Sequence, residues 1–427
     1  MKFRQVDIDG ITLLYEKSRM CKGVSFCIVA EGGSSQDSIP GISHFYEHML
    51  FNGTNEHTGE ELGKLIRKYN CRQNASTGRS CIKVYSVNSA KNFEKNFAIC
   101  SEMFFDSNFP KDKIKKEKGV VNQEINRYLD RNEAVCFQQI FNKIYSYPEY
   151  KHHTLGTPES LNKITQKHLQ DLQKRISVRE NIVVSVAGNV SLCKCKKLVK
   201  KYIADVLPSG QSQKPDIFDL TINGRPQLVL LTKPTFKTCI NVCIKKDGCE
   251  NKKINYYNNV LGSVLNRLKG RLYNTFREEN SLVYSTRFER VCNRKDGFDC
   301  YEIYTSKDKV NECIDALAKL LKDLQKNGIT KEEWEDFKSG EKVKEDTNVE
   351  IYEDWAHENY DKYSMWKDAW KKREKMYKKY KKIVCYEEVN DYIKNTILSD
   401  EIWISIVGDV SKKDIYSYKK MCDVLTK

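Results

Sequence analysis

Two apolar segments with the same ending recur in the chain at a separation of about half its length. The segments "NIVVSVAGNVS" (Asn181–Ser191) and "EIWISIVGDVS" (Glu401–Ser411) are each predicted to form a buried strand that ends in Gly, Asn or Asp, Val and Ser. Their glycines are 408 − 188 = 220 residues apart in a chain of 427. The segments "GVSFCIVAEGG" from Gly23 and "TCINVCIKKDG" from Thr238 also match as short apolar runs that stop at glycine. The sequence therefore predicts a duplicated domain.

Each half mixes strands with longer helical patterns. The segment 157–175 begins with Thr-Pro-Glu, a good helix start, and the segment 307–328 ends in glycine, a good helix stop. The mixture predicts an α+β fold in each half, with helices packed on one face of a mainly antiparallel sheet. Residues 207–226 are rich in Pro, Gly, Ser and Gln, the composition of a linker. The predicted divisions are an N-terminal domain (1–208), a linker (209–226) and a C-terminal domain (227–427).

The composition favours a globular protein without a membrane span. Apolar residues make up 40% of the chain, and no apolar run reaches the roughly 18–20 residues that a bilayer requires. The N-terminus carries acidic residues and no apolar core segment, so we predict no secretory signal. The 16 cysteines are scattered without CxxC spacing, which is typical of reduced thiols in a large cytoplasmic protein. We therefore predict a cytoplasmic location.

The net charge of +15 is compatible with several kinds of partner. Surfaces for nucleic acid, an anionic membrane or acidic substrates all favour excess Lys and Arg, and a solvated Lys-rich surface has the same charge. The segment Lys362–Val384 interleaves aromatic side chains with many lysines. Such a segment can bind single-stranded nucleic acid or a membrane, or can line a chamber for acidic peptides. We favour a helix whose aromatic stripe packs on the sheet, and we expect no nucleic-acid partner.

The stretch "PGISHFYEHMLFNGT" (Pro40–Thr54) carries the strongest chemical motif. If residues 42–52 form a helix, His44 and His48 project from one face and can hold one ion together. Glu47 flanks that face, where a carboxylate can take a proton from water whose pKa zinc has lowered to about 7. The order His-x-x-Glu-His is the inverzincin pattern. A histidine pair on an amphipathic helix without a metal is the alternative.

A pair of glutamates further along the chain extends this motif. Glu124 stands 124 − 48 = 76 residues after His48, and Glu117 lies seven residues before Glu124, two helical turns away on the same face. With them the sequence resembles the M16 family of zinc metallopeptidases, the pitrilysin and mitochondrial processing peptidase group. The resemblance implies that His44, His48 and Glu124 hold zinc. It also implies that Glu47 activates water and that Glu117 supports the metal site.

Other segments carry the same resemblance. "NASTGRSCIKVYSV" (Asn74–Val87) is similar to the family's "NA-T" segment and the strand after it, whose edge accepts the substrate backbone as an added strand. "HHTLGTPESL" resembles the His-x-x-x-Gly-Thr region of the family, and we predict that His152 and His153 lie in a solvated loop. "GRLYNTFREENSLVYST" places Arg277 and Tyr284 on positions that in the family bind the substrate at the scissile carbonyl. The alternative is an Arg and a Tyr, two helical turns apart, that only pack the domain.

Some positions differ from the family pattern. Tyr46 stands where the family usually has leucine, and Asn280-Ser281 replaces a turn that usually contains glycine. His357 is followed by glutamate but by no second histidine at the right distance, so we predict a structural role. None of these residues is a predicted ligand, so the resemblance still implies catalysis.

The resemblance implies a zinc endopeptidase that hydrolyses unfolded peptides, with leader or precursor peptides among the candidates and acidic peptides favoured by charge. In the family the working unit is a clamshell of four such domains. Two domains form half of it, which implies a homodimer or a heterodimer with a related chain. M16 relatives also include scaffold subunits that have lost activity, usually with a broken HxxEH motif. A silent scaffold subunit, or a basic protein that binds nucleic acid or membranes, is the alternative.

Overall fold

The computed structural model describes residues 2–18, 22–150, 152–212, 217–347, 352–367 and 370–426. The chain forms two compact units: Met1–Arg127, Pro148–Ile217 and Val349–Asp368 make up the first, and Tyr128–Tyr147, Phe218–Asn348 and Ala369–Lys427 make up the second. Each half of the chain thus contributes one helix to the other unit, α5 (Asn132–Ile144) to the second and α13 (Tyr352–Trp366) to the first. The predicted domains, 1–208 and 227–427, were contiguous, whereas each unit also contains one helix from the other half of the chain. Part of the predicted linker 209–226 lies outside the described residues.

The first unit contains a six-stranded sheet in the order β1-β2-β6-β3-β5-β4. Neighbouring strands run antiparallel except β2 and β6, which are parallel. The strands are β1 (Lys2–Ile8), β2 (Ile11–Lys17), β3 (Gly23–Glu31), β4 (Arg72–Thr77), β5 (Cys81–Ser89) and β6 (Ile182–Gly188). The β-branched residues of β6 are all buried, because both faces of the sheet centre are covered.

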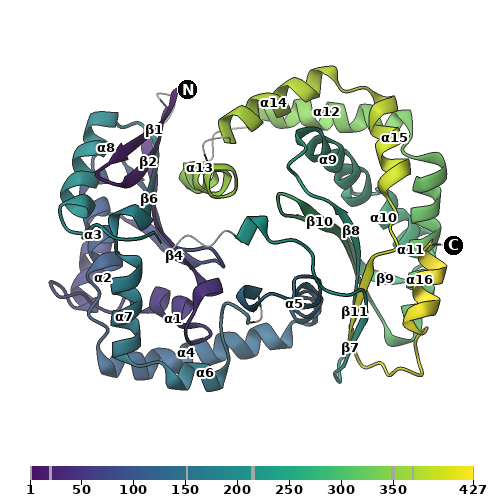
Figure 1. Ribbon diagram of the computed structural model, residues 1–427, viewed down its shortest axis with the longest axis horizontal. Coiled ribbons are helices and arrows are strands. Elements are labelled where there is room, and N and C mark those ends of the chain that lie inside the picture. The colour runs from purple at the N-terminus through teal and green to yellow at the C-terminus, as the bar shows by residue number, and fades with distance from the viewer. Residues whose placement is uncertain are drawn as a thin grey trace. The chain divides into compact units, whose positions relative to one another are not determined.

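Helices cover this sheet on both faces. The helices of the unit are α1 (Ile42–Met49), α2 (Gly59–Lys68), α3 (Phe93–Phe105), α4 (Lys111–Asp130), α6 (Pro158–Lys163), α7 (Gln166–Ile176) and α8 (Leu192–Val199). Short turns lie at Ser34–Gln36, Pro148–Tyr150, Arg179–Asn181 and Lys200–Ala204. Helices α3 and α8 pack on one face, and the exchanged α13 packs on the other face over β3 and β6 (Figure 1). The buried Glu16 carboxylate anchors α13, because it accepts hydrogen bonds from Trp355 Nε1 (3.2 Å) and Asn359 Nδ2 (3.1 Å).

The second unit repeats this arrangement. Its sheet has the order β7-β11-β8-β10-β9, and only β7 and β11 are parallel. That order and those directions match β2-β6-β3-β5-β4 of the first unit, so the predicted duplicated α+β fold is confirmed. Helices were predicted on one face of each sheet, and the second face is also covered because each unit receives a helix from the other half of the chain. The strands are β7 (Leu228–Thr232), β8 (Thr238–Asp247), β9 (Val283–Cys292), β10 (Asp296–Thr305) and β11 (Ile402–Gly408).

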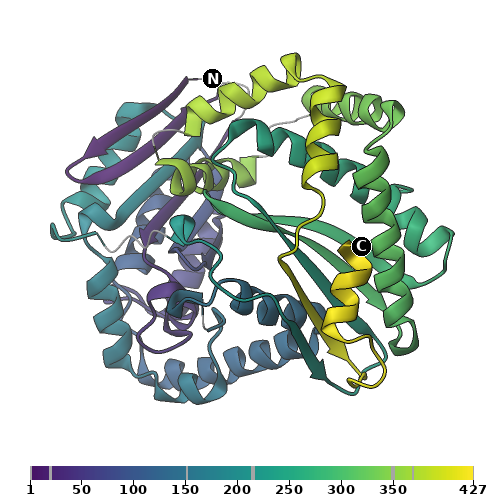
Figure 2. The same ribbon diagram turned by 45° about the vertical axis from the view of Figure 1, so that its right-hand side comes forward.

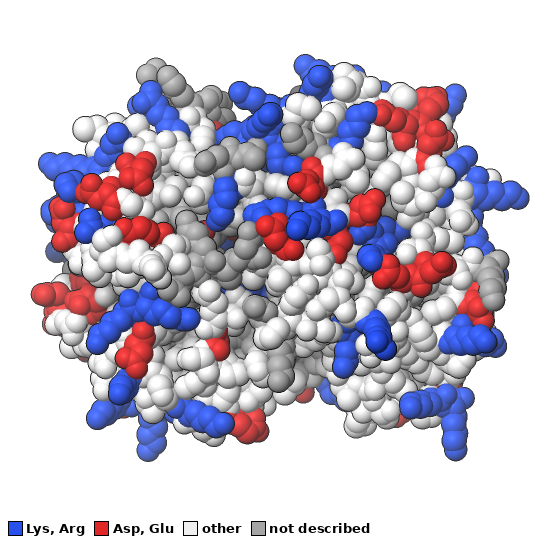
Figure 3. Space-filling model, viewed as in Figure 1, with Lys and Arg blue, Asp and Glu red and all other residues white. Residues whose placement is uncertain are grey.

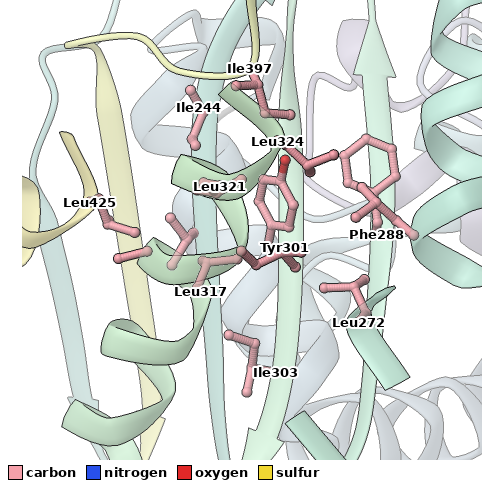
Figure 4. Close-up of a cluster of buried hydrophobic side chains, with 14 of the residues drawn as sticks. Ile244, Leu272, Phe288, Tyr301, Ile303, Leu317, Leu321, Leu324, Ile397 and Leu425 are labelled. Carbon is pink, nitrogen blue, oxygen red and sulfur yellow. The ribbon is translucent and has the colours of Figure 1, made fainter. Parts of the chain in front are cut away.

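An apolar helix stripe forms the core of the second unit. Helices α11 and α16 lie together on one face of the sheet, and the exchanged α5 covers the other face (Figures 1 and 2). Leu317, Leu321 and Leu324 of α11 point toward Tyr301 and Phe288 of the sheet (Figure 4). The helices are α9 (Lys252–Asn266), α10 (Arg271–Tyr273), α11 (Val310–Asn327), α12 (Lys331–Thr347), α14 (Trp370–Ile383), α15 (Tyr386–Thr396) and α16 (Tyr418–Thr426). Short turns lie at Ile217–Asp219, Asn274–Glu278 and Lys307–Lys309.

Of two predicted helices, one is divided into two and the other ends at glycine as predicted. The segment 157–175 forms two helices, α6 and α7, because the Thr165 hydroxyl accepts a hydrogen bond from His168 N and starts a new helix. The segment 307–328 forms α11, which ends where Gly328 adopts a φ of 71°.

The basic aromatic segment Lys362–Val384 is not one helix packed on a sheet. Helix α13 ends at Trp366, before Lys367 with a φ of 46°, and α14 begins at Trp370 in the second unit. Tyr377 and Tyr380 of α14 pack against the core beside α9. The aromatic residues therefore pack, as predicted, but from two separate helices: α13 lies on the sheet of the first unit, and α14 lies against α9 in the second. Residues 368 and 369 lie outside the described part.

Charge is mixed on the visible surface. On the face shown in Figure 3, basic and acidic side chains of the described residues are interspersed. Among those residues we also find no helix that combines the length and the apolar character needed to cross a bilayer.

Candidate metal centre

Helix α1 begins at a tight, glycine-dependent turn. Gly41 precedes it with a φ of 89°, and the Asp37 carboxylate accepts hydrogen bonds from Gly41 N (3.1 Å), Ser43 N (3.4 Å) and Ser43 Oγ (2.5 Å). The apolar side chains of Ile42 and Phe45 in α1 are buried. The helix spans eight residues and is shorter than the predicted 42–52. Its orientation is therefore fixed by both its start and its apolar face.

Helix α6 and the loop before it hold the start of α1 in place. Ser160 Oγ donates a hydrogen bond to Pro40 O at 2.7 Å, and Gly156 has a φ of 73°. A Cβ atom at Gly156 would lie 2.3 Å from Pro40 O. Both the left-handed backbone and this close approach therefore require glycine.

We expect Gly156→Ala to lower the free energy of unfolding by about 1–3 kcal/mol. The matched control is Gly119→Ala, because a Cβ there meets nothing within 4 Å and the residue lies inside α4. The control should stabilise the protein by roughly 0.5–1 kcal/mol, since alanine is the better helix former. Urea unfolding curves of the three proteins measure both changes, and equal midpoints for Gly156→Ala and the wild type would contradict this account.

His44, His48 and Glu124 form a compact set of possible metal ligands. Their ligand atoms all lie within 4.8 Å of one another. Glu124 Oε2 lies 3.7 Å from His44 Nε2 and 3.3 Å from His48 Nε2. The histidines come from successive turns of α1, and the glutamate comes from α4, so two helices supply the possible ligands. The structure thus brings together the three residues predicted as ligands.

The environment keeps His44 neutral. Burial, together with the nearby His48 and His153, lowers its pKa to about 3. A neutral imidazole offers a lone pair to a metal ion. Among the described residues, His44 Nδ1 is buried without a hydrogen-bond partner, so packing rather than a second polar group orients this ring.

Glu117 fixes the orientation of the second imidazole. His48 Nδ1 lies 2.8 Å from Glu117 Oε1. A carboxylate accepts there, so the proton stays on Nδ1, and Nε2, on the Glu124 side, is the nitrogen whose lone pair a metal ion would take. Burial alone would lower the pKa of His48, but the Glu117 hydrogen bond and the surrounding carboxylates outweigh it and raise that pKa. Glu117 thus contacts a predicted metal ligand, and its supporting role stays a prediction.

Glu47 faces the same cleft and has a partner that the sequence did not reveal. Thr77 Oγ1 donates a hydrogen bond to Glu47 Oε2 at 2.8 Å, and it also lies 3.3 Å from Ser43 O. Burial raises the pKa of Glu47 above its ordinary value, despite the Thr77 hydrogen bond. A half-buried carboxylate with a raised pKa is suited to accept and release a proton. Only the "NA-T" pattern around Thr77 hinted at this contact.

These residues line one cleft of about 910 Å³ in the first unit. Its walls are His44, Glu47, His48, Phe51, Asn52, Asn74, Ala75, Glu117, Val120, Gln123, Glu124 and Arg127. Asn74 and Ala75 belong to β4, which pairs only with β5 among the described strands and so lies at the sheet edge. The unpaired side of an edge strand can hydrogen-bond an extended peptide. The cleft therefore combines possible metal ligands, a proton acceptor and an open strand edge.

The donor set suits zinc. Two imidazole nitrogens and one carboxylate are the ligands of many catalytic zinc sites, which keep a further position open. The low pKa of His44 and the Glu117 contact leave both Nε2 atoms able to bind a cation. The residues present therefore fit the ion that the motif implies.

Arg277 and Tyr284 lie in the second unit, whereas the metal ligands lie in the first. Arg277 is exposed in the turn Asn274–Glu278, with its guanidinium 5.4 Å from the centre of the Tyr273 ring. Tyr284 is 61% exposed in β9. Because one residue lies in a helical turn and the other in a strand, they are not two turns apart on one helix. Between them Ser281 has a φ of 49°, the conformation for which glycine is usual.

The structure also places the four other residues that the sequence analysis discussed, Tyr46, His152, His153 and His357. Tyr46 is buried, and its hydroxyl donates to Phe104 O at 2.5 Å. His357 packs edge-on against the Tyr85 ring, with ring centres 3.9 Å apart. His152 is exposed as predicted, but the prediction for His153 was wrong: it is half-buried, and burial lowers its pKa to about 4. It packs into the turn that supports α1 because its Nδ1 accepts a hydrogen bond from Leu155 N.

Comparison with known proteins identifies relatives of both halves. Residues 13–158 match the family model described as "Insulinase (Peptidase family M16)", and residues 163–340 match "Peptidase M16 inactive domain". The chain is 25% identical over 340 residues to a Bacillus subtilis protein named "Uncharacterized zinc protease YmxG", an alignment that covers 77% of this chain and 80% of that protein. It is 26% identical over 198 residues to the human mitochondrial-processing peptidase subunit beta, and this alignment covers 45% of this chain and 40% of that protein. The alignment with a Rickettsia bellii protein named "Uncharacterized zinc protease" likewise spans 45% of that protein.

Solved structures share the fold at low sequence identity. A peptidase M16 inactive domain from Pseudomonas fluorescens superposes with a TM-score of 0.84 at 15% identity, over 96% of this chain and 99% of that chain. The periplasmic protease PqqL from Escherichia coli superposes with a TM-score of 0.78 at 15% identity, over 100% of this chain and 50% of that chain. These structures show the fold, and the two family models, which together match residues 13–158 and 163–340, show that the chain belongs to the M16 peptidase family.

Proposed function

We propose that this chain is a zinc-dependent endopeptidase that hydrolyses unfolded peptides at the His44, His48 and Glu124 cluster. The observation that carries the proposal is the convergence of these three ligand atoms within 4.8 Å, in one cleft with a proton acceptor. Relatives named zinc proteases support it. Zinc, when bound, supplies Lewis-acid chemistry, because it lowers the pKa of water and polarises a peptide carbonyl.

The residues of the chain supply proton transfer and alignment. Glu47 takes a proton from the attacking water and passes it to the leaving amine, and its raised pKa supports this exchange. Thr77 holds the Glu47 carboxylate in position through its hydroxyl. The free edge of β4 aligns the peptide backbone beside the cleft, as an added strand.

We expect the Thr77 hydroxyl to matter for rate more than for substrate binding. Thr77→Val keeps the side-chain shape but removes the hydrogen bond to a charged group, so kcat should fall by about 10-fold to 100-fold. Thr77→Ser retains the hydroxyl and should retain most of the activity. Steady-state kinetics with one unfolded peptide, together with the zinc content of each variant, measure the effect. Equal kcat for Thr77→Val and the wild type would contradict the positioning role.

Arg277 and Tyr284 are proposed to bind the substrate at the scissile carbonyl, in a chamber completed by a second chain. A guanidinium and a phenol hydroxyl are donors that can stabilise a developing oxyanion. Because this chain carries both the metal motif and the Arg and Tyr pair, a homodimer is the simplest assembly; a heterodimer with a related chain is the alternative. Activity that rises more steeply than protein concentration, alongside dimerisation in sedimentation, would support the homodimer.

A second candidate is a catalytically silent subunit. It is favoured by the match of residues 163–340 to the M16 inactive domain model, and the second half contains no HxxEH motif. The intact His44, Glu47, His48 and Glu124 favour the enzyme. Cleavage of an unfolded protein that stops with a chelator and returns with added zinc would support the peptidase. A zinc-loaded wild type that cleaves no unfolded substrate, alone or mixed with a related chain, would support the silent subunit.

We also propose a preference for acidic peptides, from the net charge of +15. A leader or precursor peptide of that character is one candidate substrate. Matched acidic and basic peptides compared at low salt test the preference, and equal cleavage rates would remove it.

A further inference from the structure

Two thiols meet at the ends of two strands in the second unit. Cys249 follows β8, and Cys292 is the last residue of β9. Both Sγ atoms donate to the carbonyl of Asn293, at 3.1 Å from Cys249 and 3.3 Å from Cys292. Cys249 N donates to the same carbonyl at 3.0 Å, and the two thiols are close enough that Cys292 can donate its proton to Cys249 instead of to that carbonyl. The pair is therefore in direct contact and held by backbone on both sides.

The surroundings favour a thiolate at Cys249, which is itself 4% exposed, and a pocket reaches the neighbouring Cys292. Cys292 is half-buried and lines a pocket together with Asn255, Asn258 and Arg290. Arg373 of α14 donates to the carbonyls of Cys249 and Glu250, so a second guanidinium lies beside the pair. The hydrogen bond from Cys292 lowers the pKa of Cys249, although burial opposes this, while the same contact raises the pKa of Cys292. Cys249 is thus the thiol that ionises first.

Another thiol pair in the same unit lacks these features. Cys243 and Cys300 face each other directly across β8 and β10 and are fully buried. The hydrogen bond with Cys243, together with burial, raises the pKa of Cys300 well above its ordinary value. Both residues of this pair are fully buried, and the raised pKa of Cys300 disfavours its thiolate, so the pair serves as an internal reference.

We propose that Cys249 and Cys292 are a redox-modification site, at which hydrogen peroxide oxidises the two thiols to a reversible disulfide. The Cys249 thiolate attacks the peroxide O–O bond and becomes a sulfenic acid, while the departing oxygen takes a proton and leaves as water. The Cys292 sulfur then attacks the sulfenic sulfur and displaces hydroxide, which takes the Cys292 proton and leaves as a second water. In sum, two thiols and one hydrogen peroxide give one disulfide and two waters. A thiol reductant reverses the step.

The test is peptide mapping of the full chain after treatment with hydrogen peroxide and alkylation of the remaining thiols. We expect a linked pair of peptides that contain Cys249 and Cys292, which disappears after dithiothreitol, while Cys243 and Cys300 stay unlinked. Cys292→Ser should abolish the link and leave a sulfenic acid at Cys249 that reacts with dimedone. The wild-type map needs no substitution, so it holds even if this variant folds poorly.

Two results would overturn the proposal. One is a treated wild type in which the exposed Cys193 is oxidised but Cys249 and Cys292 are both still alkylated. The other is a link between Cys243 and Cys300 at the same peroxide concentration. It would mean that the proximity of two thiols alone determines which disulfide forms. The readout is mass, not catalysis, so its outcome is independent of whether the chain cleaves peptides.

Discussion

Glu47→Gln is expected to lower the rate of peptide cleavage by about 10²–10⁴-fold. The zinc content should stay that of the wild type, because Glu47 is not among the three clustered ligands. Glutamine has the same shape and can still accept the Thr77 hydrogen bond, so the cleft keeps its geometry. What it loses is the ability to take a proton from water. Kinetics on an unfolded peptide, with metal analysis of the same sample, measure both parts.

Glu60→Gln is the matched control for this change. Glu60 lies on α2, is largely exposed and pairs only with Lys64 at 2.8 Å among the ion pairs of the described residues. Glu60→Gln should cleave the peptide at the wild-type rate, since Glu60 is not in the cleft and an exposed ion pair contributes little to stability. If Glu47→Gln cleaves as fast as Glu60→Gln, Glu47 is not the proton acceptor.

The second large effect concerns the metal itself. His48→Ala removes one of three ligands and should leave a chain that neither retains zinc nor cleaves peptides. Glu117→Gln keeps all three ligands but weakens the contact with His48 Nδ1, so zinc affinity should fall by about 10-fold to 100-fold. Zinc titration against a competing chelator measures both affinities.

The chain offers a control with the same geometry in a different place. His57 Nδ1 lies 2.8 Å from Glu102 Oε1, the same distance as in the His48 and Glu117 pair. His57 is not among the clustered ligands, so His57→Ala should bind zinc as the wild type does. A loss of zinc in His57→Ala as large as that in His48→Ala would show that general destabilisation, not a lost ligand, explains the result.

The sequence predicted the elements that local spacing controls. Four-residue spacing put His44 and His48 on one face of α1, and seven-residue spacing put Glu117 and Glu124 on one face of α4, as the structure has them. The repeated strand endings at Gly188 and Gly408 predicted the duplication seen in the two sheets. These features depend on residues that are near in the chain or on a repeated pattern.

Contacts between distant segments could not be predicted in the same way. An amphipathic pattern shows that a helix buries one face, but not against which sheet, so the exchange of α5 and α13 between the units was invisible. The hydrogen bond from Thr77 to Glu47 joins a strand to a helix thirty residues away. The end of α13 depends on a left-handed Lys367, a conformation that the lysine itself does not signal.

The central claim is that zinc bound by His44, His48 and Glu124 is required for peptide cleavage. The most direct measurement is a zinc titration of the metal-free wild type in which bound metal and cleavage of an unfolded peptide are followed in the same samples. The account predicts that activity rises in proportion to bound zinc and saturates when one ion is bound per chain. Cleavage by the metal-free protein, or a chain saturated with zinc that cleaves nothing, would contradict it.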